Sequence, residues 1–378
     1  FGSSFRLFGR RPTAITMLRP SRWLRFVALP SSRAPCHRRP DVIPRSLTRS
    51  VMRTFSAQGK VTAADVKELR ERTGASIGKC RKALVEEGGD PEKAIEWLRR
   101  QGVRSMERRV AESVEALLAM SHSTQAGAIV ELRAETDFVT RSDLFQQLCV
   151  AVARTAAREA VKHGGGAEDS LDTLSEAPLE GSADIKQLRP NVSVGAALME
   201  LGSVLGERML LSSSRSLAAQ PGGVVAGYAH RKQADGHLGT GRMAALVSVS
   251  PEGGDVDGER LRATALQLAR HIVAAQPRFV DRAAIPCEVL ANERRVALEA
   301  HLAQMDETRA AAMDKKVLEK IVSGKEKKFV QEVALLGQEI LLPQSDEKPP
   351  TVEKWLRAEA SSMGVSALKV DGFRVAVL

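Results

Sequence analysis

Apolar residues recur at two different spacings along the chain, and together these spacings predict a mixed α+β fold. Helical spacing of three to four residues predicts helices over residues 141–162, 192–205, 261–275 and 352–358. Short apolar runs of strand length are found at residues 114–120, 128–132, 209–211, 224–228, 243–249, 333–342 and 373–378. Residues 167–182 are acidic and polar, with Gly and Pro, and we expect a surface loop there.

Residues 60–102 predict three short helices. Thr62 is a typical N-cap, and Gly74 is a typical helix stop. A later start is marked by Pro91 at a first helical position, and we expect that helix to end at Gly102. A segment of this size barely forms an independent core, so we expect it to dock on the rest of the chain or to bind something.

Two further segments are expected to be helical and rich in charge. Residues 103–112 predict a charged helical connector. Residues 287–329 are rich in Ala, Glu, Lys, Arg and Met, and their apolar spacing predicts two helices folded against each other through a turn at 306–309. A pair of surface helices packed on the core is the alternative interpretation of this stretch.

A phenylalanine stands at a polar corner between the strand expected at 128–132 and the helix expected at 141–162. The corner has the sequence Glu-Thr-Asp-Phe-Val, residues 135–139. Phe138 can fold back over the core as a plug while Asp137 caps the following helix. It can instead protrude and enter a pocket on a partner, because aromatic residues often dominate binding energy. The local pattern leaves both interpretations open.

The basic charge of the chain is confined to its beginning. The formal net charge is +10, yet residues 1–59 alone contain twelve arginines and a single acidic residue, Asp41. The remaining 44 basic and 45 acidic residues nearly cancel. Because phosphate contacts need clustered Lys and Arg, this distribution argues against nucleic-acid binding by the later, folded part.

Residues 1–57 have the composition of an organelle transit peptide. They are rich in Arg, Ser and Pro, and apolar residues such as Trp23 and Phe26 are interspersed with arginines. Residues 53–57 resemble a matrix-processing site. We expect a mitochondrial matrix protein, with the plastid as the alternative; a basic disordered arm is the remaining interpretation.

No motif for chemical catalysis is visible in the sequence. The cysteines lie far apart and form no CxxC pair: Cys36, Cys80, Cys149 and Cys287. We find no HExxH, Walker loop, nucleophile-base pattern or metal-ligand spacing. No apolar run approaches the 18 residues of a membrane span. We therefore expect a binding protein that is not an enzyme, with no catalytic residue, cofactor, metal or membrane contact.

Several stretches together resemble one family, elongation factor Ts. They are residues 61–74, 80–84, 89–90 and 94–95 near the start, Thr-Asp-Phe-Val at 136–139, Tyr-Ala-His at 228–230, residues 271–279 and residues 320–329. The resemblance covers about residues 60–378. It departs from the bacterial pattern at Ser-Ile-Gly, residues 76–78, and at Arg-Ala, residues 133–134. The first departure lies in the N-terminal module and bears on how tightly that module binds its partner.

The resemblance implies a domain organisation. Residues 60–102 would form a ubiquitin-associated-like three-helix module. Residues 103–222 and 223–378 would form two α+β core subdomains, N and C, with antiparallel sheets. A helical coiled-coil hairpin would be inserted at about 286–330.

The resemblance also implies a function, guanine nucleotide exchange on organellar elongation factor Tu. The protein would bind that partner in its GDP-bound and nucleotide-free states, with no direct nucleic-acid contact. The residues implied at the interface are Thr136, Asp137, Phe138, Val139, Ile77, Arg81 and His230. The sequence leaves oligomeric state open. Alternative functions are an organellar ribosome- or RNA-associated protein and a ubiquitin-associated-type adaptor that acts through residues 60–102.

Overall fold

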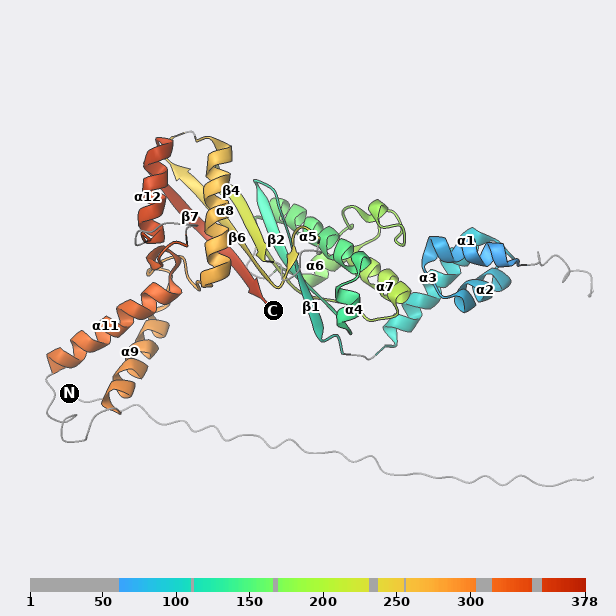
Figure 1. Ribbon diagram of the computed structural model, residues 1–378, viewed down its shortest axis with the longest axis horizontal. Coiled ribbons are helices and arrows are strands. Elements are labelled where there is room, and N and C mark those ends of the chain that lie inside the picture. The colour runs from blue at the N-terminus through green and yellow to red at the C-terminus, as the bar shows by residue number, and fades with distance from the viewer. Residues whose placement is uncertain are drawn as a thin grey trace, which may run out of the picture. The chain divides into compact units, whose positions relative to one another are not determined.

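The described residues of the computed structural model combine helices with antiparallel sheets, which confirms the predicted α+β class (Figure 1). The structure describes residues 61–109, 112–165, 169–230, 237–254, 256–303, 315–341 and 349–378. The expected transit peptide and the expected turn at 306–309 lie outside these ranges.

The first sheet is built on the hairpin of β1 (Glu115–His122) and β2 (Ala126–Ala134). The strand β3 (Leu210–Ala218) pairs with β2, and the short β5 (Thr240–Gly241) pairs with β1. The strand order is β3-β2-β1-β5, with every pair antiparallel. The strand expected at 209–211 is thus much longer, because its polar residues also form ladder hydrogen bonds. Notably, β5 comes from the part expected to be subdomain C.

The second sheet contains β4 (Val224–His230), β6 (Met243–Glu252) and β7 (Ala367–Val377), in the order β4-β6-β7 and antiparallel. The strand β7 begins before the expected start at residue 373. The strand expected at 333–342 is wrong. Val333 ends the helix Lys315–Val333, and the described residues after it make a 3-10 turn at Leu335–Gly337 and isolated bridges. Its apolar side chains, such as Leu335, are buried beneath the following helix instead of in a sheet.

Helices cover the outer face of each sheet, and the inner faces pack against each other. The helices α5 (Asp143–His163) and α7 (Val194–Leu205) share an apolar core with the first sheet. The helices α8 (Gly258–Ala275) and α12 (Val352–Met363) do the same with the second sheet. Strand alternation separates these cores: in β1, Ala119 faces α5 and the adjacent Leu118 lies in the core between the sheets.

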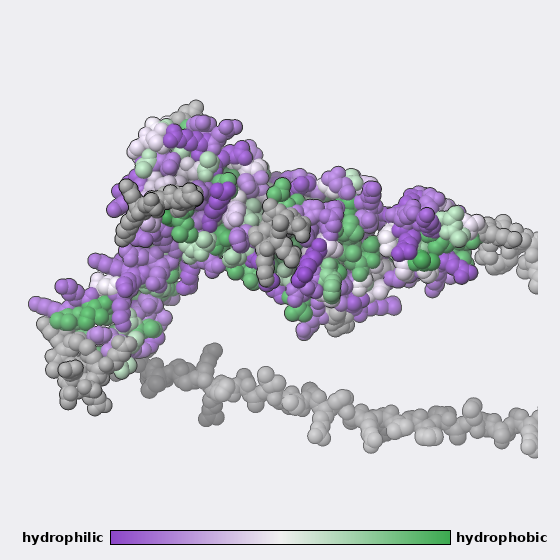
Figure 2. Space-filling view, viewed as in Figure 1, coloured by the Kyte–Doolittle hydropathy of each residue, from purple (hydrophilic) through white to green (hydrophobic). Residues whose placement is uncertain are grey.

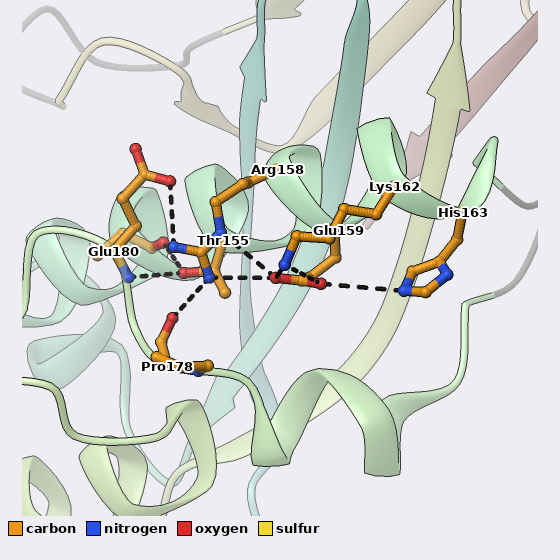
Figure 3. A network of polar contacts seen from close by, with 8 residues as sticks. Thr155, Arg158, Glu159, Lys162, His163, Pro178 and Glu180 are labelled. Atoms are coloured by element: carbon orange, nitrogen blue, oxygen red, sulfur yellow. Dashed lines mark hydrogen bonds and ion pairs between the residues drawn. The ribbon is translucent and has the colours of Figure 1, made fainter.

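The expectation of a plain loop at 167–182 is wrong where the structure describes it. A short helix, α6 (Leu171–Glu176), forms there, and a 3-10 turn (Ser182–Asp184) begins at the last residue of the stretch. The residues between α6 and this turn are tied to α5 by polar contacts (Figure 3). The Thr155 hydroxyl accepts from the Glu180 backbone N–H at 2.9 Å, and Arg158 donates to the Pro178 carbonyl at 2.9 Å. Buried Leu174 completes the attachment.

Three helices precede the sheets: α1 (Ala63–Thr73), α2 (Ile77–Glu86) and α3 (Pro91–Glu107). The helix α1 has the expected cap, a capping box that also uses Asp65. Their small shared core is Val66, Leu69, Cys80, Ala83, Leu84 and Ala94.

The expected helix end at Gly102 is wrong, because α3 runs on to Glu107. A Cβ at Gly102 would lie 2.4 Å from Cβ of Ser203 in α7. The glycine therefore permits close packing of α3 on α7, and packing, not termination, explains its presence.

Two helices, α9 (Cys287–Leu302) and α11 (Lys315–Val333), lie against each other after the Pro286 turn (Figure 1). Glu326 on α11 is buried and pairs with Arg294 on α9 and with Arg282. The Arg294 hydrogen bond holds the pKa of the Glu326 carboxyl below its ordinary value. Among the described residues, none of the helices combines the length and apolar character that a membrane span requires.

Candidate functional site

The Thr-Asp-Phe-Val motif forms a short helix, α4 (Asp137–Thr140), between β2 and α5. Val139 turns inward and is buried in the core beneath α5. Phe138 turns outward, with 83% of its surface exposed. The interpretation of Phe138 as a plug is therefore wrong: its neighbour Val139 fills that place, and successive residues of a helix cannot face the same way.

Thr136 is fastened to the segment that ends α7. Its backbone N–H donates to Glu207 Oε2 at 3.0 Å, and its hydroxyl donates to Glu207 Oε1 at 2.5 Å. Glu207 directly follows Gly206, the left-handed cap of α7. A residue 71 positions away thus fixes the beginning of α4.

Glu135, just before the motif, joins two further segments. Its Oε2 accepts from Arg109 Nη2 at 2.7 Å, and its Oε1 accepts from the Arg208 backbone N–H at 2.6 Å. The hydrogen bond from Arg109 is the main reason that the pKa of Glu135 lies below its ordinary value. The corner is therefore held in place from both sides, so that Phe138 projects from a supported turn.

Asp137 does not cap the long helix, so this part of the plug interpretation is also wrong. Ser142 is the N-cap of α5, and its hydroxyl accepts from the Phe145 N–H. Asp137 instead occupies the first turn of α4 and pairs with Arg141 at 2.9 Å. Both side chains are partly exposed, so the carboxylate stays accessible beside Phe138.

Ile77 and Arg81 both lie on the exposed surface of α2. Ile77 is 57% exposed and therefore does not belong to the core of the three helices. Val85, one turn after Arg81, is also exposed. Positions 77, 81 and 85 are four residues apart and thus share one helix face. Cys80 and Leu84 form a neighbouring buried stripe of the same helix, because residues three and seven positions apart lie close together around a helix.

His230 stands at the exposed end of β4. Its ring Nδ1 lies 3.3 Å from the Tyr228 hydroxyl, and its backbone carbonyl accepts from the Arg242 N–H. The partner of the His230 ring is thus a side chain two positions earlier on the same strand.

One contact that no sequence pattern indicated joins a later loop to the start of α5. The His237 N–H donates to Gln146 Oε1 at 2.9 Å, and His237 Nε2 lies 2.5 Å from Asp143 Oδ1. The partners are more than 90 positions apart, so no spacing rule could have revealed the pair. In the described ranges, no group of three or more His, Cys, Asp or Glu side chains could hold a metal ion.

Comparison with known proteins bears directly on this corner. The family model described as "Elongation factor TS" matches residues 135–375, starting at Glu135. The chain belongs to the elongation factor Ts family. Elongation factor Ts of Rhizobium leguminosarum bv. trifolii (strain WSM2304) is 35% identical over 284 residues, 75% of this chain and 82% of the relative. Elongation factor Ts of Rhizobium meliloti (strain 1021) is 34% identical over 305 residues, 80% and 88% of the two chains.

The family model covers less of the chain than the two relatives, which match over 284 and 305 residues. The match of the family model runs from the corner before α4 to residue 375 in β7 and includes all strands from β3 onward. It omits α1–α3, β1 and β2, although β1 and β2 form the centre of the first sheet. The supported corner with Phe138 thus stands at the start of the matched region.

Proposed function

We propose that the protein is a guanine nucleotide exchange factor for organellar elongation factor Tu. It binds the GDP-bound partner, promotes GDP release and leaves a nucleotide-free complex to which GTP can bind. Membership of the elongation factor Ts family supports exchange on elongation factor Tu. The observation that carries the proposal is the 83% exposure of Phe138 on a corner held by Glu135 and Thr136.

Phe138 acts as a wedge. An aromatic side chain left in water gains free energy when it enters an apolar cleft, and we place that cleft between two helices of the partner's G domain. Since Val139 is anchored in the core and Thr136 is tied to Glu207, little ordering cost is left for binding. The wedge therefore has the rigidity needed to favour one conformation of the partner.

Asp137 adds a polar contact close to the wedge. We infer that its carboxylate disturbs the partner's network around Mg²⁺, while the ion pair with Arg141 orients it. Exchange requires coupling: the factor favours a partner conformation that binds nucleotide poorly. By linkage, nucleotide then weakens binding of the factor by the same ratio.

Other surfaces extend the interface. Ile77 and Arg81 present an apolar and a cationic group on α2, in the module that we take to be ubiquitin-associated-like. His230 offers a ring at the end of β4. We take α9 and α11 to be the two arms of a coiled-coil hairpin. In this proposal the protein performs no covalent chemistry of its own and needs no cofactor or metal.

We also propose that the protein works in the mitochondrial matrix. Support comes from residues 1–57, whose twelve arginines and single acidic residue suit an import signal. Fusion of residues 1–57 to a fluorescent protein tests this: the fusion should enter mitochondria. Entry into plastids alone, or retention in the cytosol, would contradict it.

The exchange function is tested by release of fluorescent GDP from organellar elongation factor Tu in a stopped-flow instrument. The full chain should accelerate release at substoichiometric concentration. No acceleration at any concentration would overturn the proposal. Retention of the protein on RNA, falling steeply as salt rises, would then favour the RNA-associated alternative.

A further inference from the structure

Two large apolar side chains of the described residues are far more exposed than the others. Phe138 is 83% exposed and Leu238 is 80% exposed, whereas the next, Val114, is 67% exposed. The face of the molecule drawn in Figure 2 is mainly hydrophilic, with apolar residues in small separate patches. Full exposure of a leucine forgoes the free energy that burial of its side chain would give, about 1.5–3 kcal/mol. Such exposure calls for a reason.

Leu238 occupies a defined position, because the residues on both sides of it are held by hydrogen bonds. His237 before it bonds to Gln146 and Asp143. Gly239 after it accepts at its carbonyl from the Met120 N–H at 2.7 Å. The Thr240 N–H and hydroxyl both donate back to the His237 carbonyl, at 3.1 and 2.8 Å. The turn therefore presents Leu238 in a defined position.

The turn is also attached to the same helix start as the wedge. Asp143, the partner of His237, is the first residue of α5 and stands five positions after Phe138. The two exposed side chains thus flank one helix terminus, one on the chain that leads into it and the other on a loop bonded to it. An interface of standard size covers about 800 Å² on each partner, far more than one helical turn. A protein that covers Phe138 therefore has enough contact area to extend to the loop.

We propose that Leu238 is a second apolar anchor for the partner that receives Phe138. It fits a shallow apolar pocket on elongation factor Tu beside the cleft for the wedge. His237 is a positioning residue, which holds the anchor to α5 through its backbone N–H and its ring. This inference rests on the proposed function and adds a contact from the part of the chain after residue 223.

The test compares the full chain with three variants, each of which changes one exposed apolar side chain. Leu238→Ser removes the anchor, Leu238→Met keeps an apolar side chain of similar size, and Val161→Ser is the matched control. Val161 is 50% exposed in the last turns of α5, at the opposite end of the helix from Asp143. Thermal unfolding of each variant is measured to check that the fold is retained. Phe138→Ala is measured in parallel.

The measured quantity is the concentration of factor that gives half-maximal acceleration of GDP release from elongation factor Tu. Leu238→Ser should raise it at least fivefold, whereas Leu238→Met and Val161→Ser should stay within twofold of the parent. Unchanged half-saturation in Leu238→Ser, with a defective Phe138→Ala, would overturn the second anchor and leave the exchange function in place. A parent chain that releases no GDP would overturn both. A change only in self-association of Leu238→Ser, seen by light scattering, would assign Leu238 to a contact between copies and also overturn the proposal.

Discussion

Replacement of Glu207 by alanine should loosen the corner that presents Phe138, without touching the wedge itself. Glu207 accepts both the backbone N–H and the hydroxyl of Thr136. In the alanine variant, both donors lose their carboxylate. Glu207→Gln is the graded comparison, since the amide oxygen can still accept the N–H while the threonine hydroxyl turns to accept from the amide nitrogen.

The magnitude follows from the number and type of these bonds. A hydrogen bond to a charged group contributes about 1.5–3 kcal/mol, and a neutral one about 1 kcal/mol. Glu207 is only half-buried, and water can replace part of what is lost. We therefore expect the free energy of local opening to fall by about 2 kcal/mol in Glu207→Ala, a change of about 30-fold in the opening equilibrium. For Glu207→Gln we expect about 1 kcal/mol, or roughly fivefold.

Amide hydrogen exchange followed by mass spectrometry measures this opening on a peptide covering residues 135–140. Exchange there should be about 30-fold faster in Glu207→Ala, intermediate in Glu207→Gln, and unchanged in peptides of β6. Half-saturation for GDP release should rise in the same order. Equal exchange rates in the parent and Glu207→Ala would refute the idea that these bonds hold the corner, and equal damage by Gln and Ala would refute the chemical ranking.

Three other predictions concern packing, pH and thiol access. Gly102→Ala should lower the free energy of unfolding in urea by about 1–3 kcal/mol, because the new Cβ would collide with Ser203. The double variant with Ser203→Gly should recover most of the loss, and failure to recover it would argue against the contact. Burial lowers the pKa of His271, so its contribution to stability is present above the unfolded pKa near 6.5 and is lost as the pH falls below that value. Between pH 8 and 5.5, the urea midpoint of His271→Gln should therefore drop less than that of the parent. An equal drop in both proteins would contradict this. Exposed Cys287 should react with an aromatic disulfide reagent in the native protein, whereas buried Cys149, whose pKa burial raises, should react only after unfolding; fast native modification of Cys149 would contradict its burial.

The sequence predicted elements well where local chemistry decides the structure. The cap at Thr62, the stop at Gly74 and the apolar runs that form β1 and β2 all depend on neighbours within a few positions. The α+β class followed from these elements. The buried apolar run near Leu335 shows the limit of such local prediction. Residues buried under α12 have the same apolar composition as residues in a buried strand, so composition alone does not distinguish the two.

The site was less predictable, since distant residues shape it. Phe138 and Val139 are adjacent and both apolar, and only the packing beneath α5 decides which is buried. Gly102 looks like a helix stop until Ser203 is seen against it. The bond between His237 and Asp143 joins residues 94 positions apart, so no local pattern encodes it.

The central claim, that Phe138 is the wedge that releases GDP, is tested most directly by the exchange assay on one variant. Fluorescent GDP release from organellar elongation factor Tu is followed with the full chain and with Phe138→Ala, at saturating and subsaturating factor. The variant should release GDP at least tenfold more slowly than the parent, equivalent to about 1.4 kcal/mol of lost coupling, while its thermal unfolding is unchanged. Release by Phe138→Ala at the parent's rate would contradict the account.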